Sequence, residues 1–287
     1  MKVFLVFISL VLAASAEDAP IMQDYHEEFG IAAAARIKAA EDAMDFDGAR
    51  VAGGSAAGLG SNPHVGGLVI AMTSNQQSVC GSSLISNTKL VTAAHCWRHG
   101  SSQARQFTVV LGSIRLFSGG NRQNTNRVAV HASYNARTLA NDIAMITINH
   151  VGYTNTINRI SIPTGTNQYV GSYATVAGFG RTGDGYLAEH GITNNQVLSQ
   201  LSLQVITNAV CAQTFGGTVT AANICVGSSG GRSPCPGDSG GPLAIGSGNN
   251  RELIGIVSFG HSSGCTRGFP AAFSRVTSFA AWIRQRL

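Results

Sequence analysis

Beyond position 50 the chain alternates short apolar runs with turn residues. Such runs occupy residues 107–113 (FTVVLGS), 142–148 (DIAMITI), 172–178 (SYATVAG), 201–206 (LSLQVI) and 251–260 (RELIGIVSFG). Short apolar or alternating segments at roughly regular spacing indicate β-strands of a sandwich or barrel. The pattern therefore predicts an all-β body, which is long enough for one large β domain or two fused barrels.

Two segments predict helices instead. At the end of the chain, residues 276–287 (VTSFAAWIRQRL) carry apolar residues at i, i+3, i+4 and i+7, the period of one helix face. Near the start, residues 31–43 (IAAAARIKAAEDA) consist mainly of strong helix formers. We therefore expect one helix before the β body and one after it.

The first sixteen residues have the pattern of an export signal. MKVFLVFISLVLAASA combines one lysine, an apolar run and a small-residue end, as secretory signals do. A membrane span needs about 20 apolar residues, and neither this segment nor a later one offers that length. We expect residues 1–16 to be a signal peptide and the protein to be secreted and extracellular, with the gut lumen as one candidate place and no membrane partner.

Charge divides the rest of the chain in two. Residues 17–50 hold nine acidic and three basic residues, a net charge of −6, whereas residues 51–287 hold five acidic and fifteen basic residues, a net charge of +10. Such an asymmetry can indicate nucleic-acid binding, but the arginines are scattered singly, so we expect no nucleic-acid partner. We interpret residues 17–50 as an acidic propeptide and residues 51–287 as the functional body.

Six cysteines would enter an oxidising compartment if the chain is exported. An even number there indicates three disulfides, although the spacing leaves their pairing open. The C-x-x-C spacing of metal sites is absent, and we expect neither a metal nor another cofactor. The six are Cys80, Cys96, Cys211, Cys225, Cys235 and Cys265.

One serine, Ser239, is surrounded by glycines in the stretch PCPGDSGGP. Residues 237–241 match G-x-S-x-G, the nucleophile elbow of α/β-hydrolases. That fold requires an acid and then a histidine after the serine. Only Glu252 and His261 follow, in a β-type segment, and the alternating helices and strands are missing. We reject the α/β-hydrolase interpretation.

Histidine, aspartate and serine do occur in the opposite order. His95 stands in VTAAHC, Asp142 opens the apolar run of NDIAMITI, and Ser239 follows in CPGDSGGP. Together with VAGG, SFG and the terminal helix, these motifs resemble those of the chymotrypsin-like serine proteases of the trypsin superfamily, in particular insect digestive chymotrypsins. The resemblance covers residues 51–287, and it implies an all-β fold of two antiparallel six-stranded β-barrels with a C-terminal α-helix.

The resemblance also implies a role for each residue. Ser239 attacks the scissile carbonyl, His95 removes and returns a proton, and Asp142 orients the imidazole. The N–H groups of Gly237 and Ser239 form the oxyanion hole. The implied function is a secreted serine endopeptidase that acts on proteins and peptides. An inactive binding homologue is the alternative, but this class typically lacks the serine or the histidine.

Activation and disulfide pairing follow from the same resemblance. A trypsin-like protease is expected to cut after Arg50, and the new amino group of Val51 to pair with Asp238, which orders the oxyanion turn. The acidic propeptide contains no cysteine and is then expected to dissociate. The implied disulfides are Cys80–Cys96, Cys211–Cys225 and Cys235–Cys265.

Specificity is inferred from positions that match the family's primary pocket. Ser233 corresponds to the floor, where an aspartate would make a relative trypsin-like. Ser258, Phe259 and Gly260 correspond to one wall, and Ala271 stands at a second wall position where glycine is usual. We expect a preference for large apolar P1 residues (Phe, Tyr, Leu), with a smaller, elastase-like preference as the alternative.

The remaining expectations concern ions, partners and biological role. Loop 112–126 matches the calcium-binding loop of some relatives but carries no carboxylate, so we expect no calcium. A propeptide without cysteine has no clip domain, which favours a digestive role over a specialised secreted protease. We also expect protease inhibitors as partners and a monomeric enzyme.

Overall fold

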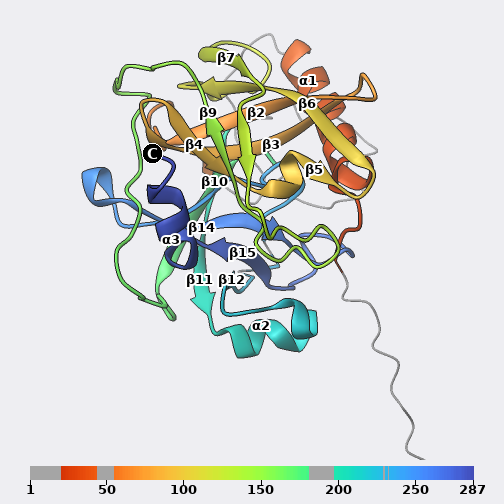
Figure 1. Cartoon of the computed structure of the whole chain (residues 1–287), viewed down its shortest axis with the longest axis vertical. Coiled ribbons are helices and arrows are strands. Elements are labelled where there is room, and N and C mark those ends of the chain that lie inside the picture. Colours follow the sequence, from red (N-terminus) through yellow and green to blue (C-terminus); the bar gives the residue numbers. More distant parts are fainter. Residues whose placement is uncertain (1–20, 44–54, 181–196, 229, 232) are drawn as a thin grey trace, which may run out of the picture.

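The computed structural model describes residues 21–43, 55–180, 197–228, 230–231 and 233–287. Within these ranges, strands predominate and form two antiparallel sheets (Figure 1). The predicted signal peptide, together with Arg50 and Val51 of the predicted cleavage site, lies outside the described residues.

The first sheet is built from the N-terminal half of the body. Its strands follow the order β5-β6-β2-β3-β4-β9-β8, and β7 pairs with β6. Strand β2 is buried on both faces: Leu68 and Ile70 belong to the main core, whereas Val69 packs in a second cluster with Ile37 of the N-terminal helix. The strands are β2 (Val65–Met72), β3 (Gln77–Ser86), β4 (Lys89–Thr92), β5 (Arg98–His99), β6 (Ser102–Leu111), β7 (Asn121–Thr125), β8 (Val128–Val130) and β9 (Ala144–Thr147).

The second sheet closes on itself. Its order is β1-β11-β10-β13-β14-β15-β12, and an additional pairing of β11 with β12 joins six of the strands into a barrel. Leu203, Ile224, Leu243 and Phe273 fill its interior. The strands are β1 (Ser55–Ala56), β10 (Tyr173–Gly178), β11 (Ser199–Ile206), β12 (Asn223–Val226), β13 (Pro242–Ile245), β14 (Glu252–Phe259) and β15 (Ala271–Arg275).

The predicted fold of two antiparallel β-barrels followed by a helix is confirmed. The second barrel is closed with six strands, as expected. The first has eight strands in the described part of the chain, and no ladder there joins the edge strands β5 and β8. It therefore curves as a half-barrel whose inner face is covered by the shared core.

Helices are few in the described ranges. The C-terminal helix α3 (Val276–Arg284) buries the apolar face predicted from its period. Helix α2 (Asn208–Phe215), which the pattern did not predict, begins at the N-cap Thr207, whose side chain accepts the N–H of Val210. Short helical turns are η2 (Ala94–Cys96), η4 (Gly216–Thr218) and η5 (Gly248–Asn250). No helix among these has the length and apolarity to cross a bilayer.

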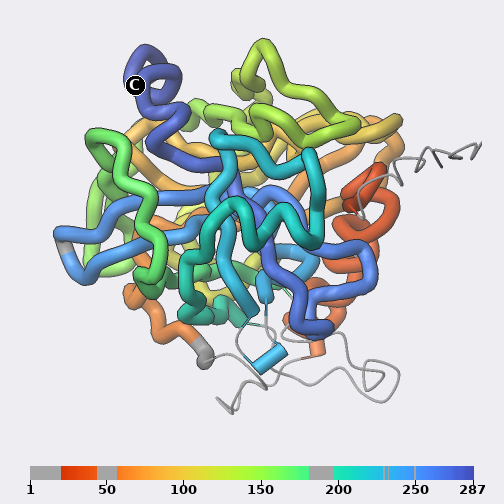
Figure 2. Tube along the Cα trace, turned by 90° about the horizontal axis from the view of Figure 1, so that it is seen from below, coloured from red at the N-terminus to blue at the C-terminus, as the bar shows by residue number. Residues whose placement is uncertain are grey.

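The N-terminal segment packs along one side of the body. The turn η1 (His26–Gly30) leads into α1 (Ile31–Asp42), as predicted for residues 31–43, and both views show this segment in red against the barrels (Figures 1 and 2). The approach is close, because a Cβ on Gly30 would lie 2.1 Å from Ser78 Oγ of β3. Residues 21–43 of the segment interpreted as a propeptide are therefore part of the packed structure.

Candidate active site

His95 and Asp142 form a buried pair joined by two hydrogen bonds. His95 lies in η2 just after β4, and Asp142 lies just before β9, which pairs with β4. The backbone N–H of His95 donates to Asp142 Oδ1 at 2.9 Å, and its ring Nδ1–H donates to Asp142 Oδ2 at 2.7 Å. These bonds fix the orientation and the tautomer of the ring, so Nε2 remains to accept a proton.

The second barrel holds the Asp142 side of this pair. Ser258 Oγ of β14 donates to Asp142 Oδ2 at 2.6 Å, and Ser274 Oγ of β15 donates to the Asp142 backbone oxygen at 2.6 Å. Burial alone would raise the pKa of the Asp142 carboxyl, but the charge of His95 and hydrogen bonds from His95 and Ser258 hold it below its usual value. From sequence, Ser258 is expected only at the pocket wall, and nothing singles out Ser274.

Ser239 lies on a turn of the second barrel that packs against the first. The Gly81 N–H of β3 donates to the Ser239 backbone oxygen at 2.7 Å. Gly240 has a φ of 78°, and a Cβ there would lie 2.2 Å from Thr92 Oγ1 of β4. Gly237 has a φ of 107°. Only glycine fits both conformations without strain, so these residues let the serine turn lie against the strands that lead to His95.

Asp238 is buried beside this turn. Its Oδ1 accepts the Gly180 N–H at 2.8 Å, and its Oδ2 accepts the Cys235 N–H at 3.0 Å. Burial raises the pKa of the Asp238 carboxyl to about 6, while these hydrogen bonds and the charge of Arg36 in α1 act in the opposite direction. A carboxylate in this position is stabilised by a cation, but Val51, the partner predicted from sequence, is outside the described residues.

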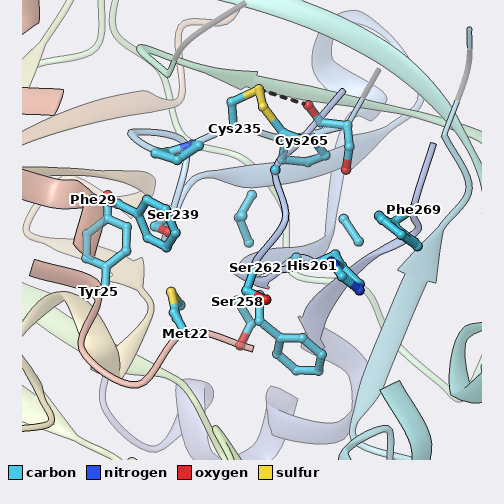
Figure 3. Close-up of a pocket in the computed structure, with 18 of the residues that line it drawn as sticks. Met22, Tyr25, Phe29, Cys235, Ser239, Ser258, His261, Ser262, Cys265 and Phe269 are labelled. Carbon is cyan, nitrogen blue, oxygen red and sulfur yellow. Dashed lines mark hydrogen bonds between the residues drawn. A yellow bond between two sulfur atoms is a disulfide. The ribbon is translucent and has the colours of Figure 1, made fainter. Parts of the chain in front are cut away.

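A pocket that Ser239 borders contains all of the residues predicted to bind substrate (Figure 3). No carboxylate belongs to its lining in the part of the chain that the structure describes. The methyl group of Ala271 is buried in the wall, whereas a Cβ on Gly260 would meet no atom within 4 Å. The predicted residues that line it are Ser233, Ser258, Phe259, Gly260 and Ala271.

A stacked pair of rings, His261 and Phe269, forms the side of the pocket opposite Tyr25 in Figure 3. Their ring centroids are 3.7 Å apart. Neither residue stands in a motif, so the sequence does not predict this wall. The stacked pair adds a flat apolar surface to the uncharged pocket.

The N-terminal segment also reaches into this site, which the sequence does not predict. Met22, Tyr25 and Phe29 line the same pocket, and Figure 3 shows Tyr25 and Phe29 beside Ser239. The signal that could have identified them is their i, i+3, i+7 spacing within an otherwise acidic stretch, which is typical of one apolar helix face.

The three disulfide pairings implied by the resemblance are confirmed. Cys80–Cys96 ties the residue after His95 to β3, Cys211–Cys225 links α2 to β12, and Cys235–Cys265 borders the pocket. The side chains of Cys80, His95 and Cys96 cluster closely enough to hold a metal ion. Both sulfur atoms are joined in the disulfide, however, so this group offers no thiolate ligand.

Loop 112–126 has no carboxylate of its own, but a carboxylate of helix α1 contacts it. Glu41 accepts hydrogen bonds from the backbone N–H groups of Leu116 and Phe117 and from the Ser118 hydroxyl. The Phe117 N–H lies 3.0 Å from Glu41 Oε2, and the Ser118 hydroxyl lies 3.2 Å from the same oxygen. This acidic residue therefore anchors the end of the N-terminal helix to the first barrel.

Comparison with known proteins gives consistent matches. The trypsin family profile matches residues 51–283. Collagenase of Hypoderma lineatum is 38% identical over 240 residues, covering 82% of this chain and 86% of that protein. Brachyurin of Leptuca pugilator is 38% identical over 238 residues, covering 82% of this chain and 97% of that protein. A solved structure of HL collagenase has a TM-score of 0.73 at 38% identity, covering 82% of this chain and 98% of that one.

Proposed function

Because the chain belongs to the trypsin family of serine endopeptidases, we propose that His95, Asp142 and Ser239 are its catalytic residues. The observation that carries this proposal is the buried His95–Asp142 pair, whose Nδ1 to Oδ2 distance is 2.7 Å. In this arrangement the imidazole keeps Nε2 for the Ser239 proton, and the ionised Asp142 stabilises the imidazolium that forms. Proteins and peptides are the substrates of this enzyme class.

The reaction proceeds in two acyl-transfer steps. Ser239 Oγ attacks the peptide carbonyl while His95 takes its proton, and His95 returns a proton to the leaving amine. Water then hydrolyses the acyl-enzyme by the same route. The N–H groups of Gly237 and Ser239 stabilise the oxyanion, and removing one such donor costs about 3 kcal/mol in comparable enzymes.

For specificity, we infer a preference for large apolar P1 residues. The support is the uncharged pocket with Ser233 at its expected floor and an aromatic wall at His261 and Phe269. The Ala271 methyl favours the elastase-like alternative. A peptide library that varies P1, cleaved by the activated enzyme, distinguishes the two. Triple-helical collagen belongs in the same assay because a relative named collagenase is 38% identical.

Substitution of Ser233 provides a direct test of the pocket assignment. Ser233→Asp should increase the rate at Arg and Lys P1 residues relative to Phe by about tenfold, because a carboxylate in the pocket pairs with a cationic side chain. The ratio of kcat/KM for matched Arg and Phe peptides measures the change, with Ser233→Asn as the uncharged control. A wild-type enzyme that already prefers basic P1 residues would show that Ser233 is not the floor.

We further infer that the chain is made as a secreted zymogen. Residues 1–16 would direct export, and a trypsin-like protease would cut after Arg50 to release residues 17–50. The family match begins at residue 51, and the buried Asp238 could receive the amino group of Val51. The three disulfides indicate an extracellular compartment. A digestive role, a monomeric state and binding of protease inhibitors remain part of this proposal.

A further inference from the structure

Tyr25 of the N-terminal segment occupies the catalytic centre. Its ring centroid lies 4.9 Å from that of His95, and its hydroxyl donates to the Val79 oxygen at 2.8 Å. Burial raises the pKa of this hydroxyl far above its usual value, against hydrogen bonds from the Ser239 side chain and the Gly237 backbone. Tyr25 is therefore a neutral phenol that lies beside the proposed nucleophile (Figure 3).

Tyr25 is bound in a way that prevents catalysis. A phenol has no acyl carbon, so it offers Ser239 nothing to cleave. Among the described residues, His95 Nε2 has no hydrogen-bond partner, so the bond through which it would take the serine proton is not formed. Met22 and Phe29 line the adjacent pocket, and the remaining cavity is about 70 Å³. A substrate cannot enter without displacing these side chains.

Polar contacts fix the segment on either side of the pocket. The Tyr25 backbone N–H donates to His99 Nδ1 at 3.0 Å. The Ser101 N–H donates to Asp24 Oδ2 at 3.1 Å. Both partners belong to the first barrel, so the segment bridges the substrate cleft and the face of β5.

Helix α1 adds an apolar contact on the outer face of the first sheet. Ala33, Ala34 and Ile37 are buried in one cluster with Val69 and Val79 of the barrel. Glu41 closes the far end through its contacts with loop residues 116–118. The net charges of −6 and +10 on the two parts of the chain also attract each other. None of these contacts includes the Arg50–Val51 peptide bond. Cleavage of that bond would therefore leave them in place.

We propose that the acidic N-terminal segment is an inhibitor that binds the substrate cleft of the mature protease reversibly, and that it does so after it has been cut from the chain. The occupant of this surface is the released segment, residues 17–50, with Tyr25 as its anchor. The inference rests on the proposed cleavage after Arg50 and on the proposed catalytic residues. It replaces simple dissociation, the expectation from sequence, with rebinding in competition with substrate.

Binding of the segment should weaken as the pH falls. His26 is buried with its Nδ1 2.8 Å from Ser78 Oγ. Burial, reinforced by His95 and His99, lowers the pKa of His26 to about 4, while Asp24 acts in the opposite direction. In the free segment, His26 takes up this proton below its usual pKa of about 6.5. The affinity of the segment for the protease is therefore highest above that pH. It should be about 30-fold lower at pH 5 than at pH 8.

The inhibition constant of the released segment between pH 5 and pH 8 measures this effect. A His26→Gln segment should show a much flatter profile, with the residual slope due to His99, whose pKa is also lowered by burial. An inhibition constant that is independent of pH for the wild-type segment would contradict the assigned burial of His26 in the complex.

The main test uses the released segment as the probe. The full chain is cut with trypsin, trypsin is removed, and hydrolysis of a Phe-P1 peptide is measured before and after the segment is separated by gel filtration. Removal should raise the rate at least about tenfold at low substrate concentration. Adding back a synthetic peptide of residues 17–50 should restore inhibition, with KM raised and kcat unchanged.

Matched peptides locate the contact. Tyr25→Ala should weaken inhibition by about 100-fold or more, since truncation of a buried aromatic ring is among the costliest changes. Glu27→Gln alters an exposed side chain and should change inhibition only slightly, because it removes one of the segment's nine acidic charges. Calorimetry with protease whose Ser239 carries a sulfonyl group should show no binding, a measurement that requires no turnover.

The outcomes separate the two proposals. Equal potency of the wild-type and Tyr25→Ala peptides, or inhibition that lowers kcat and leaves KM unchanged, would overturn the inhibitory role. Failure of the wild-type peptide to bind active enzyme would overturn it as well. A protease that binds the peptide through Tyr25 but remains inactive after its removal would instead overturn the proposed catalytic assignment.

Discussion

Replacing the proposed nucleophile, Ser239→Ala, should lower kcat for peptide hydrolysis by about 10⁶-fold while the protein remains folded. The residual rate would come from oxyanion stabilisation and substrate binding, which do not require the hydroxyl. Folding should be unaffected, because the contact of this turn with the first barrel is made by the Ser239 backbone oxygen and the Gly81 N–H.

Active enzyme, separated from its N-terminal segment, provides the reference for this measurement. Initial rates on a Phe-P1 peptide and a far-ultraviolet spectrum give activity and folding for the same samples. Ser247→Ala is the matched control, since Ser247 is exposed and does not line the pocket. Near-normal turnover by a folded Ser239→Ala protein would refute the proposed mechanism.

The substitution Arg50→Gln blocks the predicted cleavage. It should give a folded and secreted protein with activity about 10²- to 10³-fold below that of the cut enzyme. Without cleavage the amino group of Val51 is not free, and Asp238 lacks the partner that we propose for the mature protein. Deleting one partner of a buried ion pair costs about 3–5 kcal/mol, which is enough to leave the oxyanion turn disordered.

Two companion variants locate the cause. Arg50→Lys keeps a site for a trypsin-like protease and should activate normally. Asp238→Asn should be cut at the normal rate yet remain poorly active, because its amide cannot neutralise an ammonium group. N-terminal sequencing and active-site titration give cleavage and activity for each variant. Full activity of uncut Arg50→Gln protein would refute the activation switch.

The features predicted best from the sequence are those that depend on neighbouring residues along the chain. The apolar period of residues 276–287 is sufficient for α3, since the face it marks is the face that is buried. The alternating runs give the strands, because a half-buried strand has a period of two residues. The predicted helix at residues 31–43 forms for the same reason, from a run of strong helix formers.

Contacts between distant segments could not be predicted in this way. Ser258 donates a hydrogen bond to the Asp142 carboxylate, and Ser274 donates one to the Asp142 backbone oxygen. Both bonds form where the two barrels pack against each other, and no local sequence pattern predicts that contact. Tyr25 likewise appears in an acidic stretch whose composition suggests a solvated segment, and only the packed structure places it against His95. The proposed catalytic residues stand in recognisable motifs, whereas the residues that cover them do not.

The absence of cysteine from residues 17–50 makes the state of the cut protein depend on its concentration. The proposed cleavage would produce inhibitor and protease in a one-to-one ratio from a single chain, so both concentrations would fall together when the solution is diluted. Mass action then favours the bound, inhibited state at high protein concentration and the free, active enzyme after dilution. A disulfide across the cut would hold the segment at a fixed effective concentration. Without one, dilution itself becomes the final step of activation.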